Sequence, residues 1–94
     1  MSKVTSIGDS AFCRCSALSG NIHSPSLTSI GTKAFKYCSN LQSITSLGLV
    51  NTIWDEAFQG CTLLETAVLP SNTSIIKRDA FINCLNLTTI SGLT

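Results

Sequence analysis

Residues 30–41 read IGTKAFKYCSNL, and this stretch decides the fold because related copies of it occur four times along the chain. The copies follow one another at a step of 23 residues without a gap. Five positions hold one residue type in every copy, which gives the pattern I-x3-A-F-x2-C-x2-L. The five columns are Ile7, Ile30, Ile53 and Ile76; Ala11, Ala34, Ala57 and Ala80; Phe12, Phe35, Phe58 and Phe81; Cys15, Cys38, Cys61 and Cys84; and Leu18, Leu41, Leu64 and Leu87. Self-similarity at a fixed period of this length is the signature of a repeat solenoid.

The spacing within one repeat predicts a short helix. The shared Ala, Phe, Cys and Leu stand at positions i, i+1, i+4 and i+7, which lie on one face of a helix. An N-cap is expected two residues before the alanine, where the first three copies carry Asp9, Thr32 and Asp55. The fourth copy carries Arg78 there, so its cap is expected to be missing or to move to Asp79.

A short strand is predicted after each helix. Residues 42–46, QSITS, alternate and include β-branched side chains, and residues 65–69, ETAVL, are closed by Pro70. Such runs indicate strands of about four residues. One column just ahead of the predicted helices holds Gly8, Gly31, Trp54 and Lys77. Because a bulky residue tolerates a positive φ poorly, this column is not expected to require one.

A single repeat cannot bury its own apolar face, so neighbouring repeats must stack and bury the five columns as continuous ladders. Parallel strands lie ~4.8 Å apart, whereas packed helices need ~8–10 Å. This mismatch predicts a bent stack with the strands on its concave side. The expected fold is therefore an α/β repeat solenoid of leucine-rich-repeat type, a curved stack of four strand and short-helix units. The expected repeats span about 3–25, 26–48, 49–71 and 72–94, and the absence of a polar cap predicts a piece of a longer array.

The repeats resemble a known family. The two units that carry the resemblance are Leu41-x2-Ile44…Ile53-x3-Ala57-Phe58-x2-Cys61 and Leu64-x2-Ala67-x-Leu69-Pro70…Ile76-x3-Ala80-Phe81-x2-Cys84. They are similar to the BspA-like leucine-rich repeats of surface-associated proteins in bacteria and protists. The resemblance implies a curved solenoid with protein-binding or adhesive roles, without catalytic activity, at the cell surface or secreted. The first copy departs from the pattern, because Asn21 stands where later copies have Ile44 and His23 stands where the third has Leu69.

Composition excludes some partners. Charged residues make up 12% of the chain and the net charge is +1, which offers no basic surface for nucleic acid or an anionic membrane. No stretch approaches the ~20 apolar residues of a membrane span, so direct insertion by this segment is not expected. The chain has 14 Ser and 11 Thr instead, which predicts a surface of hydroxyl groups. The sequons at Asn72 and Asn86 are possible glycosylation sites that arise readily by chance in such a composition.

The cysteines and the histidine do not suggest chemistry. A zinc site needs paired ligands, and the only close pair is Cys13-x-Cys15, so neither a metal nor another cofactor is expected. With helices ~8–10 Å apart the ladder cysteines would exceed the ~7 Å limit for a disulfide, so they are predicted to be buried free thiols. Cys13 is predicted to face outward. His23 has no acid nearby in the sequence, and the Asp55-Glu56 pair fits a helix start, so no catalytic residue and no enzymatic activity are predicted.

A binding surface is predicted on the concave face, where strand residues beside the ladder positions point outward. The predicted positions are Gly20, Ile22, Ser43, Thr45, Thr66, Val68, Thr89 and Ser91. Small hydroxyls there suit hydrogen bonds to a protein or glycan ligand, although Ser and Thr also simply favour exposed strands. Tyr37 and Trp54 stand in variable columns and are further candidates, because exposed aromatics are frequent binding hot spots.

Three hypotheses about function follow. The first is a protein-binding or adhesion module of a surface protein. The second is a structural spacer within a longer array of repeats. The third is an intracellular scaffold for protein interactions, which unpaired cysteines would suit.

Overall fold

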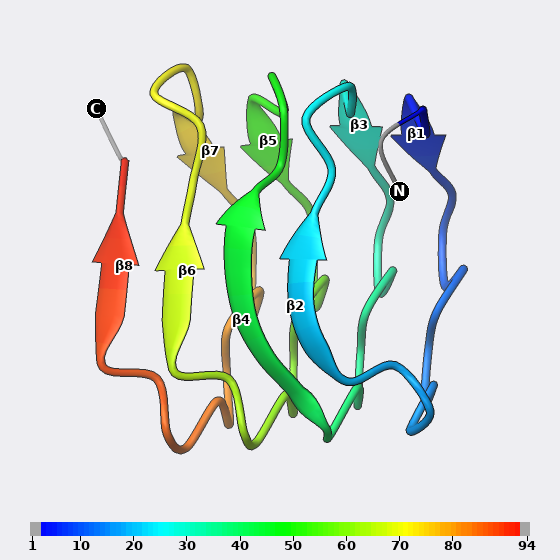
Figure 1. Cartoon of the computed structure of the whole chain (residues 1–94), viewed down its shortest axis with the longest axis vertical. Coiled ribbons are helices and arrows are strands. Elements are labelled where there is room, and N and C mark those ends of the chain that lie inside the picture. Colours follow the sequence, from blue (N-terminus) through cyan, green and yellow to red (C-terminus); the bar gives the residue numbers. More distant parts are fainter. Residues whose placement is uncertain (1–2, 93–94) are drawn as a thin grey trace.

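A computed structural model describes residues 3–92. The described chain winds through four stacked coils, one for each repeat, and places eight short strands on two sides of the stack (Figure 1). The long sheet contains β2 (Gly20–His23), β4 (Leu41–Ser46), β6 (Thr66–Val68) and β8 (Thr89–Ser91). The other side contains β1 (Ser6–Ile7), β3 (Ser29–Ile30), β5 (Thr52–Ile53) and β7 (Ile75–Ile76).

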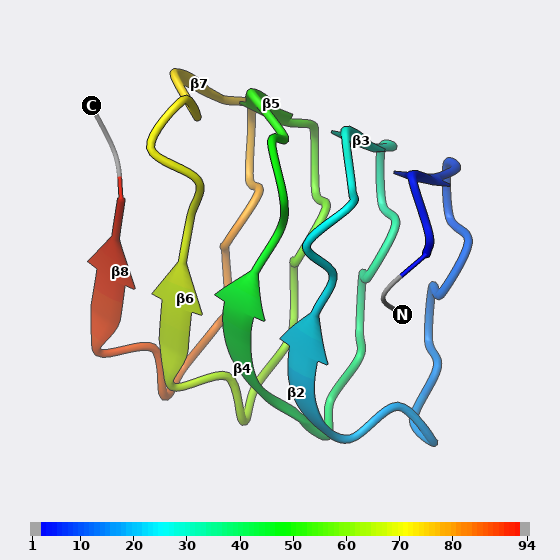
Figure 2. The ribbon, with the colours of Figure 1, turned by 45° about the horizontal axis from the view of Figure 1, so that its top comes forward.

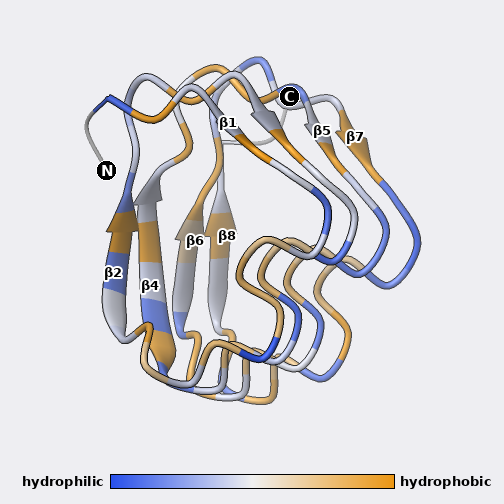
Figure 3. Ribbon diagram, turned by 90° about the vertical axis from the view of Figure 1, so that its right-hand side faces the viewer, coloured by the Kyte–Doolittle hydropathy of each residue, from blue (hydrophilic) through white to orange (hydrophobic). Residues whose placement is uncertain are grey.

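All strand pairs are parallel. The long sheet has the order β2-β4-β6-β8, and the short strands pair as β1-β3 and β5-β7. In Figure 2 the short strands β3, β5 and β7 follow one edge of the stack, away from the long sheet. Figure 3 looks along the stack, where the coils lie one behind another. Equivalent residues of neighbouring repeats therefore stack directly, as in the pair Thr66–Thr89.

The predicted helix is wrong, because the described residues contain none. The segment that begins at Gly31 is a run of tight turns in which alternate amides bond in two different directions. One set donates within the repeat, three residues back: Ala34 to Gly31 (3.3 Å), Lys36 to Lys33 (3.2 Å) and Cys38 to Phe35 (3.1 Å). The other set donates to carbonyls of the next repeat: Lys33 to Asp55 (3.0 Å), Phe35 to Ala57 (2.8 Å) and Tyr37 to Gln59 (2.7 Å). An α-helix keeps its amide bonds inside the segment, whereas here half of them join neighbouring coils.

Two positions in each repeat have a positive φ, as the third residue of a type II turn does. They are Ser10, Lys33, Glu56 and Asp79 (57–59°), and Arg14, Tyr37, Gly60 and Asn83 (60–73°). The column of Gly8, Gly31, Trp54 and Lys77 has no positive φ, so that prediction is confirmed. The turns also replace the predicted N-caps: the Asp9 carboxylate accepts the Thr32 amide of the next repeat at 2.9 Å.

The spacing of the turns matches that of the strands. The four phenylalanine rings stack with centroids 5.3, 5.1 and 5.3 Å apart and with interplanar angles of 4–8°. Strands in a sheet lie ~4.8 Å apart. The helix-to-strand mismatch that predicted a bent stack with a concave strand side is therefore absent.

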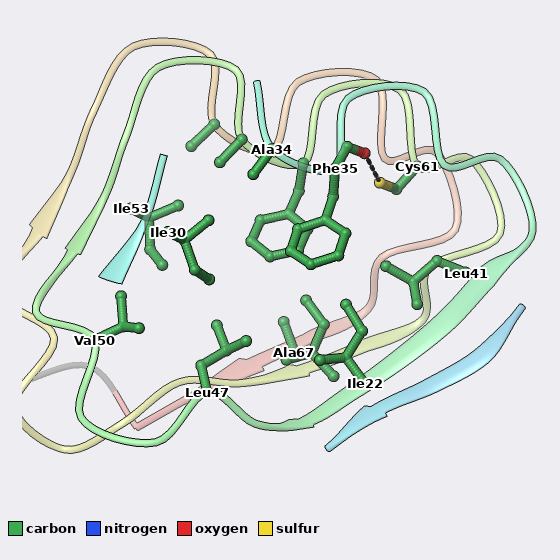
Figure 4. Close-up of a cluster of buried hydrophobic side chains, with 14 of the residues drawn as sticks. Ile22, Ile30, Ala34, Phe35, Leu41, Leu47, Val50, Ile53, Cys61 and Ala67 are labelled. Atoms are coloured by element: carbon green, nitrogen blue, oxygen red, sulfur yellow. Dashed lines mark hydrogen bonds between the residues drawn. The ribbon is translucent and has the colours of Figure 1, made fainter. Parts of the chain in front are cut away.

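The five predicted columns do form the core. Their interior members, from Ile30 to Leu64, are fully buried or nearly so. In the first and last coils Ile7 and Ala80 are buried, and the other members of the columns are partly or largely exposed. Figure 4 shows the stacked rings around Phe35 with Ile30 and Ala34 beside them. A further buried column holds Leu27, Val50 and Thr73, and the Thr73 hydroxyl donates to the Val50 carbonyl at 2.6 Å.

The first strand corrects a predicted register. The 23-residue step placed Asn21 in the core column of Ile44 and Ile22 on the outer face. In the structure β2 contains a bulge, Gly20 has a φ of 78°, and Ile22 pairs with Ile44 and is fully buried. Burying the apolar Ile22 in place of the polar Asn21 explains the shift, since a buried amide without partners is costly.

Candidate functional site

The outward side chains of the long sheet form one surface, here called the sheet face. Its members are Asn21, His23, Ser43, Thr45, Thr66, Val68, Thr89 and Ser91. Those on β2, β4 and β6 flank the buried Ile22, Ile44 and Ala67, because successive side chains of a strand point to opposite sides. Those on β8 flank Ile90, which is 41% exposed. Six members of the sheet face are predicted positions. Asn21 and His23 were missed, and Ile22 was wrongly included; the polar–apolar–polar order of these three residues is the signal that could have placed them.

The part of the sheet face on β2 and β4 is occupied by its own hydrogen bonds. The Asn21 side-chain amide nitrogen donates to the Thr45 hydroxyl at 2.9 Å, and the Ser43 hydroxyl donates to the Asn21 side-chain oxygen Oδ1 at 3.0 Å. His23 Nδ1 lies 3.3 Å from the same Thr45 oxygen. His23 therefore contacts a hydroxyl group, which gives it no acid to orient it as a catalytic base.

The part on β6 and β8 is different. Register places Thr66 beside Thr89 and Val68 beside Ser91. Val68, Thr89 and Ser91 are exposed, and Thr66 is half-buried. Among the described residues, no side-chain hydrogen bond uses the hydroxyls of Thr66, Thr89 or Ser91. This half of the face therefore presents hydroxyl donors and acceptors around one exposed apolar side chain.

Tyr37 lies on the turns, away from the sheet face, and is half-buried. Its ring has the Arg14 guanidinium carbon 4.7 Å and the Lys36 amine 5.2 Å from the centroid. On the next coil it covers Gly60, where an added Cβ would lie 2.4 Å from Tyr37 Cδ1. Tyr37 is thus enclosed by its own neighbours, and the structure does not bring it together with the sheet face.

An ion pair supports the same cluster. The Lys36 amine donates to Glu56, and this hydrogen bond raises the pKa of Lys36 and lowers the pKa of Glu56. Both groups are therefore charged at neutral pH. Trp54 is 44% exposed on another side of the coil, with the Lys77 amine 5.5 Å from its ring centroid.

The ladder thiols have a structural contact in common. Three of the four donate to the phenylalanine carbonyl of the preceding repeat: Cys38 to Phe12 (3.1 Å), Cys61 to Phe35 (3.2 Å) and Cys84 to Phe58 (3.1 Å). Figure 4 shows the Cys61 contact. All five cysteines are free, but the predicted reason was wrong, because the repeats lie far closer than packed helices. Burial raises the pKa of Cys38 to about 11, and the Cys84 thiol together with burial raises the pKa of Cys61.

The described part of the chain holds no group of three or more His, Cys, Asp or Glu side chains placed to hold a metal ion. It forms no detectable pocket. It has no helix long and apolar enough to cross a membrane.

The comparisons with known proteins agree with this architecture. The model of the BspA-type leucine-rich repeat region (6 copies) matches residues 1–93. Among solved structures, a leucine-rich repeat protein from Bacteroides ovatus is similar, with a TM-score of 0.63 and 26% sequence identity over 94% of this chain. This chain spans 29% of that protein's length. No curated protein matches. Four coils of about 23 residues with this shared column pattern place the chain in the BspA-type leucine-rich repeat family.

Proposed function

We propose that this chain is a non-catalytic binding module that holds a protein or glycan ligand on the sheet face, in a surface-associated, adhesive protein. The observation that carries the proposal is the part of the sheet face on β6 and β8, where hydroxyl groups have no side-chain hydrogen-bond partner. There Thr66, Thr89 and Ser91 offer hydroxyls without side-chain partners beside the exposed Val68.

The sheet face is already ordered before a ligand binds, which supports the proposal. Thr66 and Val68 are fixed on a strand that has a partner on each side, β4 and β8. A ligand that binds there orders few groups of the protein, which lowers the entropic cost of association. The face carries no Lys, Arg, Asp or Glu, so the contact energy comes from hydrogen bonds and apolar contact.

The test begins by identifying a ligand on arrays of host proteins and glycans with the 94-residue chain as probe. Thr66→Arg and Val68→Arg each add bulk at the centre of the face and should lower affinity by at least tenfold, about 1.4 kcal/mol. Trp54→Ala is the matched control on another side of the coil and should bind like the parent chain. Affinity should also vary only weakly with salt, because no charged side chain lies on the face.

Two results contradict the proposal. Unchanged affinity in both arginine variants, with loss in Trp54→Ala or Tyr37→Ala, moves the site to the turns. Failure to retain any ligand favours the spacer function, in which the repeats set length alone.

A further inference from the structure

The side of the stack that carries the short strands is not bonded equally at the three junctions between coils. At two junctions the strands pair, β1 with β3 and β5 with β7, whereas β3 and β5 lie in separate sheets. Amides beside the paired strands also donate to carbonyls of the preceding coil: Thr28 to Thr5 (2.7 Å), Gly31 to Ile7 (2.8 Å), Ser74 to Asn51 (3.1 Å) and Lys77 to Ile53 (2.7 Å). The equivalent amides at the middle junction, those of Asn51 and Trp54, have no acceptor among residues 3–92. This unbonded line between residues 28–31 and 51–54 is here called the seam.

The other two sides of the middle junction are bonded. On the sheet side β4 pairs with β6. On the turn side the amides of Lys33, Phe35 and Tyr37 donate to carbonyls of the third repeat at 2.7–3.0 Å. The Ile30 and Ile53 side chains beneath the seam are buried and lie next to each other (Figure 4). The seam is therefore a gap in backbone hydrogen bonding along one side, and the apolar core continues across it.

The residue that stands at the seam is Trp54, in a column otherwise filled by Gly8, Gly31 and Lys77. At Gly31 the coils pass so closely that an added Cβ would lie 2.5 Å from the Asp9 nitrogen of the first repeat. Trp54 brings a large planar side chain to the same place one coil later, and a side chain that does not fit displaces the backbone. Lys77 is also large, but its flexible chain reaches over the indole, with the amine 5.5 Å from the ring centroid. A bulky and rigid side chain thus distinguishes the unbonded junction from the two bonded ones.

The seam can widen without loss of hydrogen bonds. Asn51 and Trp54 are exposed residues, so water can reach this edge of the coil and bond to the amides that the second repeat leaves free. Widening either of the other junctions on this side would break the strand pairs and amide bonds that join the coils there. Regions with few internal hydrogen bonds open locally at a low cost in free energy.

We propose that the Trp54 indole holds the seam open and makes it a hinge, at which the second and third coils rock apart and together. The β4–β6 pair and the turn amides stay bonded and act as the axis of this motion. Hinge motion of this kind is absorbed by a few positions, and here it changes the curvature of the stack. Strands β6 and β8 lie on the same side of the hinge, so their part of the sheet face moves as one unit.

The first measurement is amide hydrogen exchange, followed by NMR on the 94-residue chain without a ligand. Protection factors compare each amide with its rate in an unstructured peptide, so different residue types can be compared. The amides of Asn51 and Trp54 should be less protected than those of Phe35 and Tyr37 by about tenfold or more. All four lie at the same junction, but only Phe35 and Tyr37 bond across it.

The second measurement detects the motion itself. Collective hinge motions occur in microseconds to milliseconds and are visible by relaxation dispersion. The methyl groups of Ile30 and Ile53 lie beneath the seam on either side of it, so they should show dispersion. The methyl groups of Ile44, beneath the bonded sheet side, should show none.

Two variants give position 54 the residues that its column holds at the bonded junctions. Trp54→Gly matches Gly31 and Trp54→Lys matches Lys77. Each should raise the protection of the Asn51 amide by about tenfold or more and remove the dispersion at Ile53. Trp54→Phe keeps an aromatic ring and is the matched control, which should behave like the parent chain. Circular dichroism checks the folding of each variant, and if one of the first two does not fold, the other decides.

Three results overturn the proposal. The first is a parent chain in which the Asn51 and Trp54 amides are as protected as that of Phe35. The second is the absence of dispersion at Ile30 and Ile53 in the parent chain. The third is an unprotected Asn51 amide in folded Trp54→Gly and Trp54→Lys, which would remove the indole as the cause of the open seam.

Discussion

The second and third repeats differ from the first and fourth, although the same residue types occupy the five columns of all four. Phe35 and Phe58 are fully buried between two stacked rings, whereas Phe12 and Phe81 are half-buried against one. The difference teaches that burial here depends on the number of neighbouring coils. Stability should therefore approximate a sum of repeat and nearest-neighbour terms.

The largest expected effect tests that comparison on the phenylalanine ladder. Phe58→Ala removes two ring contacts and leaves a cavity, which should lower the free energy of unfolding by about 3–5 kcal/mol. Phe81→Ala removes one contact, in the last described coil, and should lower the free energy of unfolding by about half as much. Urea denaturation of both variants measures the difference. An equal decrease in the free energy of unfolding in the two variants would show that the number of neighbouring coils does not determine the contribution of a phenylalanine to stability.

A smaller effect is expected at two glycines of one column. A Cβ added at Gly31 would lie 2.5 Å from the Asp9 nitrogen and 2.7 Å from the Gly8 carbonyl carbon, while one added at Gly8 would have nothing within 4 Å. Gly31→Ala should therefore lower the free energy of unfolding by about 1–3 kcal/mol, as overpacking does. Gly8→Ala should change it by less than about 0.5 kcal/mol. Thermal melts of the two variants sharpen the comparison, and similar melting temperatures would contradict it.

The smallest effect concerns pH and the thiol ladder. Burial raises the pKa of Cys38 from 9.0 to about 11. A raised pKa means that the folded state favours the protonated thiol. The contribution of Cys38 to the free energy of unfolding is therefore fully present below about pH 9 and is lost as the pH rises towards 11. The free energy of unfolding of the parent chain should fall over this range. Cys38→Ser keeps a hydroxyl donor in place and should make the free energy of unfolding depend less on pH over this range. If the free energy of unfolding depends on pH in the same way in Cys38→Ser and in the parent chain, the Cys38 thiol is not the cause of this pH dependence.

Much of the fold was predictable because the 23-residue period identifies which residues stack. The core columns through Ile30, Phe35 and Leu41 follow from that period alone, and the structure confirms them. The helix was predicted wrongly because the spacing i, i+1, i+4 and i+7 also suits consecutive turns that bury the same side chains. The deciding feature is a positive φ at Lys33 and Tyr37, and neither residue type signals one.

The sheet face was predicted less well at its edge. The strict period was applied to β2, where one bulge moves Ile22 inward and leaves Asn21 and His23 outside. A register shift of one residue exchanges the two sides of a strand, so the error changed the candidate site more than it changed the fold. Where the period holds, at Thr66 and Val68, the outward positions lie as predicted.

The amide bonds between coils have a consequence for how the chain folds. They join residues 22 to 24 positions apart, as Phe12 and Ala34 (22) and Lys77 and Ile53 (24) are, wherever they lie in the stack. Adding a coil therefore closes a loop of constant length, and its entropic cost does not grow with the array. Because folding speed depends on the sequence separation of contacts, a long array should form at a rate set by a single coil, and duplication of one 23-residue unit should lengthen the protein without slowing its folding.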